Sequence, residues 1–262
     1  MNTTSALLPI RTVIVFSCLF MFSLGMAVAD ESGMLAGELA NAPGRSDEDK
    51  ARDVQRRPGQ VLTFLGLRSG DTTLDIWAAS GWYSEVLSIA VGPEGKVYCQ
   101  NAPSVLQFRD GAYDKALTAR LSNTRLPNVT RLDEELVNTS ISPSSVDFAI
   151  TALNFHDVYN RNGADAAAKL LESVFGVLMP GGTFGLIDHV GSTGADNTAL
   201  HRIDSSLVRT AATNAGFIIE AESDLLAHPE DDHSKGVFDP SVRGNTDRFI
   251  LRLRKPELTS HR

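Results

Sequence analysis

Residues Leu74–Tyr83, with the sequence LDIWAASGWY, give the strongest indication of the fold of this chain. It begins as an apolar strand, continues through small residues and enters a run with helical spacing. Small residues between a strand and a helix let the backbone approach a ligand closely, because few side chains stand in the way. The first amides of the helix then face that ligand. The stretch therefore predicts a strand–turn–helix unit that binds a ligand at its turn.

Outward from this unit, strands and helices are predicted to alternate. Val146–Leu153 is apolar on both faces, as a central parallel strand should be. The other strands are expected at residues 72–77, 96–100, 129–132, 183–187, 217–221 and 248–253. Helices are expected at residues 83–91, 105–121, 165–178 and 198–215. Repeated β-α-β units imply an α/β fold with a doubly wound, mostly parallel sheet and helices on both faces.

The first 29 residues are predicted to be a signal peptide. Arg11 precedes an apolar run that ends in Ala27-Val28-Ala29, a pattern typical of cleaved export signals. An uncleaved anchor is the alternative, since about 18 apolar residues can span a bilayer. Cleavage near Ala29 predicts a periplasmic or secreted protein without stable membrane association. The remaining segments are a flexible lead-in at 30–50, one α/β domain at 51–256 and a tail at 257–262.

Charge and cysteine content narrow the class of partner. The chain has 24 basic and 32 acidic residues, with a net charge of −8. Nucleic acids and anionic membranes are poor partners for such a chain, because they are negative too. Cys18 lies in the predicted signal, so the mature chain keeps only Cys99 and forms no internal disulfide. A small-molecule substrate is the expected partner.

Polar residues follow most of the predicted strands, where open parallel sheets bind their ligands. They are Gln100 and Asn101 after the second strand, Asp133 after the third, Asn154, His156 and Asp157 after the fourth, and Asp188 and His189 after the fifth. Because the carboxyl ends of parallel strands meet at one edge, we expect these groups to border one binding cleft.

The opening stretch resembles the acidic-x-G-x-G-x-G signature of class I S-adenosylmethionine (SAM) methyltransferases. Asp75 supplies the acid and Gly81 the third glycine, whereas Trp77 and Ala79 occupy the first two glycine positions. The dinucleotide fingerprint G-x-G-x-x-G fits less well, because Trp82 would stand where its third glycine must pack closely.

A wider resemblance, to an exported and poorly characterised branch of that superfamily, covers most of residues 45–256. In that branch a Trp follows the acid, in a run similar to IWPGGGWY. The matching segments are Arg52–Tyr83, Asn154–Asp157, Leu200–Asp204, Asp231–His233 and Asp247–Phe249. The resemblance implies a seven-stranded fold with an antiparallel last strand, and SAM as the cofactor.

The resemblance also implies roles for single residues. Asp75 would lie near the methionine end of SAM and order the loop, Gln100 or Asn101 would face the ribose hydroxyls, and Asp133 would approach the adenine amino group. The full set of expected cofactor contacts is Asp75, Trp77, Ala79, Gly81, Tyr83, Gln100, Asn101 and Asp133. Structural alternatives remain open, because Asp75 and Asp133 could cap a turn or a helix and Trp77 could only pack.

His156 is the expected general base, Asp157 could orient it, and Asn154 is the third expected catalytic residue. Methyl transfer is a direct displacement, so the protein mainly positions the two reactants. A base is needed only where the acceptor loses a proton, and histidine titrates near neutral pH. A buried histidine with locally satisfied nitrogens is the alternative.

No metal is expected, because no His and Asp group has the spacing of a known zinc motif such as H-E-x-x-H. The polar loop at 224–246, with two histidines, is long enough to be functional or disordered. His201 and Asp204 are expected on one face of the 198–215 helix. The function expected is SAM-dependent methylation of a small acceptor. A non-catalytic SAM- or nucleoside-binding protein and a metal-assisted hydrolase or lyase are the alternatives.

Overall fold

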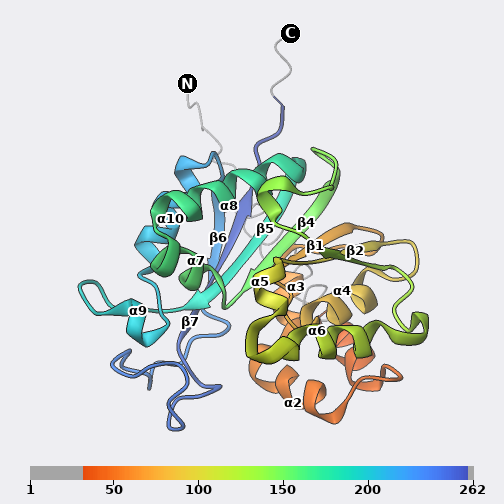
Figure 1. Ribbon diagram of the computed structural model, residues 1–262, viewed down its shortest axis with the longest axis horizontal. Coiled ribbons are helices and arrows are strands. Elements are labelled where there is room, and N and C mark those ends of the chain that lie inside the picture. The colour runs from red at the N-terminus through yellow and green to blue at the C-terminus, as the bar shows by residue number, and fades with distance from the viewer. Residues whose placement is uncertain (1–31, 259–262) are drawn as a thin grey trace, which may run out of the picture.

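The computed structural model describes residues 32–258, so the predicted signal peptide lies outside the described residues. Seven strands form one sheet in the order β3-β2-β1-β4-β5-β7-β6 (Figure 1). They are β1 (Thr72–Ile76), β2 (Lys96–Asn101), β3 (Val129–Asp133), β4 (Val146–Ala152), β5 (Leu178–His189), β6 (Ile218–Ser223) and β7 (Arg248–Arg254).

Strands β1 to β5 pair in parallel, while β7 runs antiparallel to both β5 and β6. The prediction of a doubly wound, seven-stranded sheet with an antiparallel last strand is therefore confirmed. The strand order changes direction between β1 and β4. Strands β2 and β3 follow β1 in the chain and lie on one side of it, whereas β4 and the strands that follow it lie on the other side. This switch point is where open α/β sheets bind ligands.

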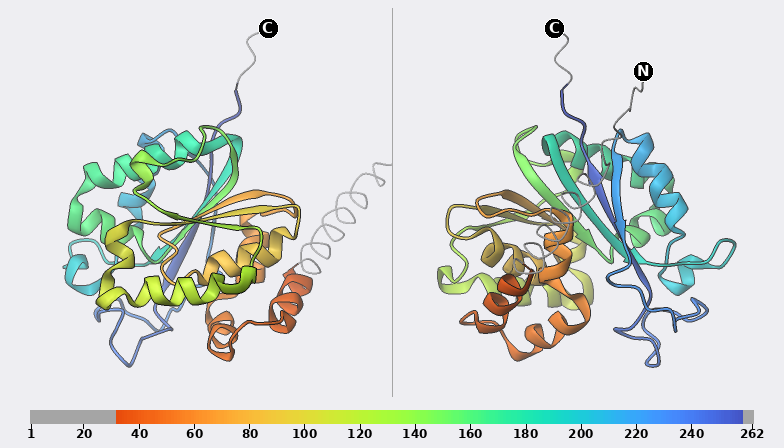
Figure 2. Two further views of the ribbon diagram at one scale, coloured as in Figure 1. Left: turned by 45° about the vertical axis from the view of Figure 1, so that its right-hand side comes forward. Right: turned by 180° about the vertical axis from the view of Figure 1, so that it is seen from behind.

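Helices cover both faces of the sheet (Figures 1 and 2), and an apolar layer lies on each face. The first face packs on α7 (Phe155–Asn162), α8 (Ala164–Val177) and α10 (Ser205–Asn214). The second packs on α3 (Pro58–Leu65), α4 (Trp82–Val91) and the helical residues 32–41. The remaining helices are α2 (Asp47–Arg56), α5 (Pro103–Leu106), α6 (Phe108–Leu121) and α9 (Asn197–Leu200). None of the helices within 32–258 is long and apolar enough to cross a bilayer.

The segment at 30–50, predicted as a flexible lead-in, contains regular structure. Residues 32–41 are helical, and α2 begins at Asp47 behind Ser46, whose hydroxyl accepts a hydrogen bond from the Asp49 amide. Leu39 is only 1% exposed, because it enters the core beside α3 and α4. The small residues of this segment carry no apolar period, so packing on the rest of the fold decides its structure.

The single helix predicted at 198–215 is wrong. Helix α9 ends at Leu200, His201 adopts a left-handed backbone with φ 53°, and α10 begins at Ser205 with Asp204 as its N-cap. His201 and Asp204 therefore do not share a helical face. The chain breaks here because the Arg202 side chain turns inward and is fully buried.

Arg202 and Asp231 form a buried ion pair, called here the arginine clasp. Nη2 of Arg202 donates to both Asp231 carboxylate oxygens, at 3.0 and 2.9 Å. Its other nitrogens donate to the carbonyls of Val190 and Lys235. Asp231 also accepts the amide of Asp247, at 2.8 Å. The long loop between β6 and β7 is thus held against the end of β5 by a fully hydrogen-bonded pair.

Candidate functional site

The loop between β1 and α4, residues 77–81, has a left-handed backbone at every second residue. The φ angles are 53° at Trp77, 51° at Ala79 and 78° at Gly81. These are the three positions where the methyltransferase signature has glycine, which adopts such angles without strain. Bulky residues rarely do so, and strain of this kind tends to collect at functional sites. The loop thus keeps a glycine-type backbone although two glycines are missing.

Gly81 has a second reason to be glycine. A Cβ atom at this position would lie 2.8 Å from Cδ1 of Leu117 on α6, and 3.3 Å from Cδ of Arg120. The loop therefore packs directly on α6, where Arg120 also donates to the carbonyl of Ser80 at 2.8 Å. Close packing of the protein on itself explains this glycine without reference to a ligand.

Two amide side chains at the end of β2 hold the loop in place. Gln100 accepts the Trp77 amide at 3.2 Å and donates to the Glu134 carbonyl at 2.7 Å. Asn101 accepts the Ala79 amide at 2.7 Å and donates to the Ala79 carbonyl at 3.3 Å. Both side chains are fully buried and engaged with the backbone. We expected these amides to face ribose hydroxyls. In the structure they bind backbone groups instead and hold the loop in place.

Asn154 reaches the same loop from β4, donating to the Trp77 carbonyl at 3.1 Å. It is the N-cap residue of α7 and is partly exposed, as are residues 77–80 of the loop. The ends of β1, β2 and β4 are thereby joined by hydrogen bonds. Most backbone amides and carbonyls of residues 77–80 make hydrogen bonds within the protein.

Asp75 lies beneath the loop and is 3% exposed. Burial raises the pKa of its carboxyl to about 7, against the opposing effects of the Ser84 hydrogen bonds and of Arg56. The Ser84 hydroxyl of α4 donates to its Oδ2 atom at 2.7 Å. Tyr83 beside it is also buried, which raises its pKa to about 12. Asp75 therefore joins β1 to α4, consistent with a role in ordering the loop.

Asp133, at the end of β3, is exposed and pairs with its neighbour Arg131 at 2.7 Å. Arg131 also contacts Asp114 and donates to Thr118, both on α6. The sequence prediction placed Asp133 at the carboxyl edge, and it does end the strand next to Asn101. Its carboxylate is accessible to a ligand, although Arg131 competes for it.

Two arginines near this edge have no acidic partner, and the sequence reasoning missed both as site residues. Among residues 32–258, neither Arg56 nor Arg248 forms an ion pair. Arg56 lies over the Trp82 ring at 4.7 Å, and Arg248 donates to the carbonyls of Gln55 and Gly244. Burial lowers the pKa of Arg56. Burial, with Arg56 nearby, lowers the pKa of Arg248 to about 10.

Unpaired positive charge that is removed from water is costly unless an anion neutralises it. Arg56 contacts Trp82 at the start of α4, and Arg248 donates to the carbonyl of the adjacent Gln55, so both lie on the α4 side of the loop. The arrangement can hold a carboxylate or a phosphate. Composition gave no signal for this pair, because Arg56 and Arg248 are far apart in the chain.

The His156 ring is held by Asp188, from the end of β5. Nδ1 of His156 lies 2.7 Å from Oδ1 of Asp188, and Oδ2 accepts the His156 amide at 2.7 Å. The His156 side chain is 4% exposed and that of Asp188 is fully buried. Burial by itself would lower the pKa of His156, but the Asp188 carboxylate, followed by Asp157, outweighs it and raises the pKa. Asp188 is the orienting acid, a role that the sequence analysis gave to Asp157.

Asp157 instead joins two histidines. Its Oδ2 lies 3.6 Å from Nε2 of His156, and its Oδ1 lies 3.2 Å from Nδ1 of His201 and 3.1 Å from Nε of Arg161. His156, Asp157 and His201 are called here the histidine cluster. The structure thus brings the three predicted catalytic residues, Asn154, His156 and Asp157, to one edge, and adds His201 to them.

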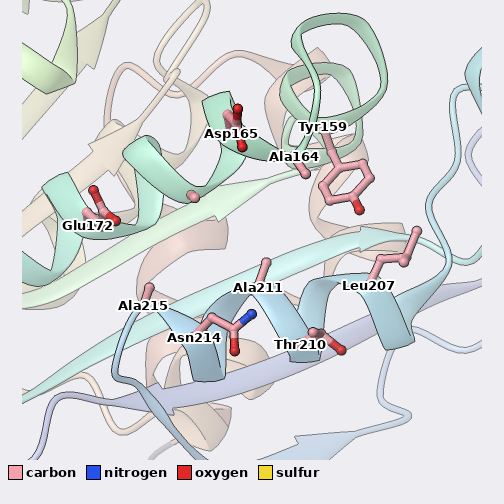
Figure 3. A pocket seen from close by; sticks show the side chains of 10 residues that line it. Tyr159, Ala164, Asp165, Glu172, Leu207, Thr210, Ala211, Asn214 and Ala215 are labelled. Atoms are coloured by element: carbon pink, nitrogen blue, oxygen red, sulfur yellow. The ribbon is translucent and has the colours of Figure 1, made fainter.

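The two described cavities lie away from this edge. The first, of about 270 Å³, opens between α8 and α10, with Tyr159 of α7 at one end (Figure 3). Its polar lining includes Asp165, Glu172 and Asn214, which approach from the two helices. The second, of about 250 Å³, lies between the helical residues 32–41 and the helices α2 and α3. Neither contains a residue of the loop or of the histidine cluster, so neither is the predicted site.

Solved structures with this fold include several methyltransferases. A SAM-dependent methyltransferase from Aquifex aeolicus is 20% identical, with a TM-score of 0.56 over 80% of this chain and 100% of that one. Phosphoethanolamine N-methyltransferase 2 from Haemonchus contortus, solved with SAM, is 14% identical, with a TM-score of 0.54 over 85% of this chain and 60% of that one.

The [4+2]-cyclase SpnF is 16% identical, with a TM-score of 0.57 over 83% of this chain and 85% of that one. No protein-family model matches the chain, and no curated protein matches it either. At these identities the likeness establishes the class I methyltransferase fold and nothing finer. The reaction must be argued from the site itself.

Proposed function

We propose that this protein binds SAM at the carboxyl edge of its sheet and transfers the methyl group to a small-molecule acceptor. The observation that carries the proposal is the loop at 77–81, whose left-handed residues stand at all three glycine positions of the methyltransferase signature. Strain at Trp77 and Ala79 is maintained by three amide side chains, Gln100, Asn101 and Asn154. Maintaining a strained turn by so many contacts is expected of a binding loop.

The residues at this edge fit the chemistry of SAM. When bound, SAM supplies a methyl group on a positively charged sulfur, open to direct attack by an acceptor. Arg56 and Arg248 would neutralise the carboxylate of its methionine part, since neither has an acidic partner within residues 32–258. The exposed carboxylate of Asp133 would meet the adenine end. The partly exposed residues 77–80 would lie between these two ends.

The acceptor would lie on the other side of the loop, against Asn154, His156 and Asp157. Asn154 spans the two sides, because it donates to the Trp77 carbonyl while capping α7. Holding an acceptor in a fixed direction relative to the methyl group supplies most of what a displacement needs. The net charge of −8 favours a small neutral or cationic acceptor over nucleic acid.

Calorimetric titration with S-adenosylhomocysteine (SAH) and with 5′-methylthioadenosine tests the proposal. The second ligand lacks the amino-acid part, so it does not need the two arginines. We expect Arg56→Met to weaken SAH binding at least about tenfold, roughly 1.4 kcal/mol, and to leave methylthioadenosine binding unchanged. Arg243→Met, at an exposed arginine of the β6–β7 loop, is the matched control.

Three outcomes separate the candidate functions. Binding of both ligands, followed by methylation in an acceptor screen, supports the enzyme. Binding without turnover on any acceptor supports a SAM- or nucleoside-binding protein on the same fold. Absence of binding to a folded sample contradicts the proposal and turns attention to a metal-assisted hydrolase or lyase.

Export belongs to the proposal as well. Cleavage after Ala29 would release a mature chain that acts in the periplasm or outside the cell, without stable membrane association. N-terminal sequencing of the protein recovered from a periplasmic or culture fraction tests this point. A mature N-terminus at Asp30 is expected, and recovery of the intact chain from the cytoplasm would contradict it.

A further inference from the structure

The His156 ring has one nitrogen committed and one left open. Asp188 is a carboxylate that accepts three hydrogen bonds, from Nδ1 and the amide of His156 and from the amide of His189 at 2.8 Å. Since a carboxylate only accepts, the proton of the neutral ring lies on Nδ1 and the lone pair on Nε2. Nε2 has no hydrogen bond within the described chain, because its nearest partner, Asp157 Oδ2, is 3.6 Å away.

A carboxylate bonded to the remote nitrogen is the usual support of a metal-bound histidine, because it fixes the ring and raises its basicity. The support is rigid here. Asp188 is fully buried at the end of β5, and His156 is 3% exposed in the first turn of α7. The side chain is therefore oriented by two elements of the core, with its free nitrogen toward Asp157.

His201 supplies a second nitrogen that lacks a partner. Its Nδ1 atom is buried and makes no hydrogen bond within residues 32–258, although Asp157 Oδ1 lies 3.2 Å away. A buried polar atom without a partner is costly. The residue also has a strained left-handed backbone, and its ring packs edge-on to Phe238 at 5.1 Å. The chain thus accepts two penalties to place this nitrogen beside Asp157.

The three ligand atoms converge. One atom each from His156, Asp157 and His201 all lie within 4.8 Å of one another. Ligands of one zinc ion stand about 3–4 Å apart, because each is about 2.0–2.2 Å from the metal. Small rotations of exposed or half-exposed side chains close the remaining gap. Arg161, which pairs with Asp157, is 57% exposed and can turn into solvent at little cost.

We infer that His156 Nε2, Asp157 and His201 Nδ1 bind a divalent cation of the zinc type. Two imidazoles and one carboxylate suit borderline transition metals and disfavour calcium and magnesium, which require oxygen. Three protein ligands leave at least one position for water or a small ligand, as in catalytic zinc sites. The inference does not depend on SAM binding. It replaces the general base expected at His156 with a metal ligand.

Zinc titration of the full mature chain, with any affinity tag removed, tests the inference in the absence of SAM. A chromophoric chelator as competitor gives the affinity, and elemental analysis after gel filtration gives the stoichiometry. We expect one zinc ion per chain and at least about tenfold weaker binding in His201→Ala. His228→Ala, at a half-buried histidine outside the cluster, should bind as the wild type does.

Cobalt substitution supplies a second readout. Visible absorption of the cobalt-loaded protein reports its coordination, and we expect the bands to be lost or shifted in His201→Ala and in Asp157→Asn. If one variant fails to fold, the other still decides. Equal zinc affinity in the wild type and both variants, or loss of binding in His228→Ala instead, would overturn the inference.

Discussion

The arginine clasp and the histidine cluster adjoin each other in the chain, yet their hydrogen bonding differs. Arg202 and Asp231 satisfy one another and several backbone groups, and both are fully buried. One residue earlier, His201 leaves its Nδ1 atom without a bond, and His156 does the same at Nε2. We interpret a buried cluster whose hydrogen bonds are all made as one that stabilises the fold. We interpret a cluster with open nitrogen atoms as one that can bind a ligand.

Breaking the arginine clasp should have the largest effect on stability. We expect Arg202→Met to lower the free energy of unfolding by about 3–5 kcal/mol, because it leaves the Asp231 charge buried and unpaired. Urea denaturation measures the change. Arg209→Met removes a surface pair with Glu222 and should cost about 1 kcal/mol or less. If Arg202→Met loses no more unfolding free energy than Arg209→Met, the clasp does not stabilise the fold more than a surface ion pair does.

Asp188→Asn removes the support of the cluster and should have the second largest effect. The variant keeps the size of the side chain but loses charge-assisted bonds, at a cost of roughly 2–3 kcal/mol. Zinc affinity should fall about 10- to 100-fold, as is usual when the acid behind a metal-bound histidine is lost. Asp224→Asn, at an exposed acid of the β6–β7 loop, is the control. Unchanged zinc affinity in Asp188→Asn would show that Asp188 is purely structural.

Asp75 lies between these two cases. It is a buried acid that accepts one side-chain hydrogen bond, from Ser84, within residues 32–258. Its folded pKa of about 7 lies above the ordinary 3.8, so the folded state holds the extra proton between these values. Stability of the wild type should therefore fall as pH rises through this window, by at most about 1.4 kcal/mol per pH unit. Asp75→Asn should gain on the wild type as pH rises from 4 to 7. Thermal unfolding across this range measures the difference, and a flat difference would contradict the assigned burial.

His201→Ala should have the smallest effect on stability. Its imidazole makes no hydrogen bond through Nδ1, so we expect a change of roughly 1 kcal/mol or less in metal-free buffer. Urea denaturation in the presence of a chelator measures it. A loss of unfolding free energy comparable with that of Arg202→Met would mean that His201 stabilises the fold. The histidine cluster would then not differ from the arginine clasp.

Local pattern predicted the sheet well, because strand length, apolar runs and turn residues are local properties. The predicted ends of β1, β2, β3 and β4 are each within one residue of the observed ends. Helix 32–41 and the break at His201 were missed, since each depends on a distant partner. Leu39 packs on α3 and α4, and Arg202 turns inward to meet Asp231.

The sequence predicted where the candidate site residues lie, and their catalytic and cofactor-binding roles stay predictions. Parallel topology brought Asn154, His156 and Asp157 to one edge, as expected from the strand ends. The amides of Gln100 and Asn101 proved to hold the loop, and Asp188 took the orienting role. Arg56 and Arg248 were recognised as candidate site residues only because neither has an acidic partner within residues 32–258. Such facts depend on contacts between segments 22 to 193 residues apart in the chain, which no local pattern contains.

A crystal structure of the protein grown with SAH is the decisive test of SAM binding at this edge. We expect the ligand at the carboxyl edge of β1 and β2, along residues 77–80, with its carboxylate toward Arg56 and Arg248 and its sulfur toward Asn154. Ligand density in the cavity between α8 and α10, or none at saturating SAH, would contradict it.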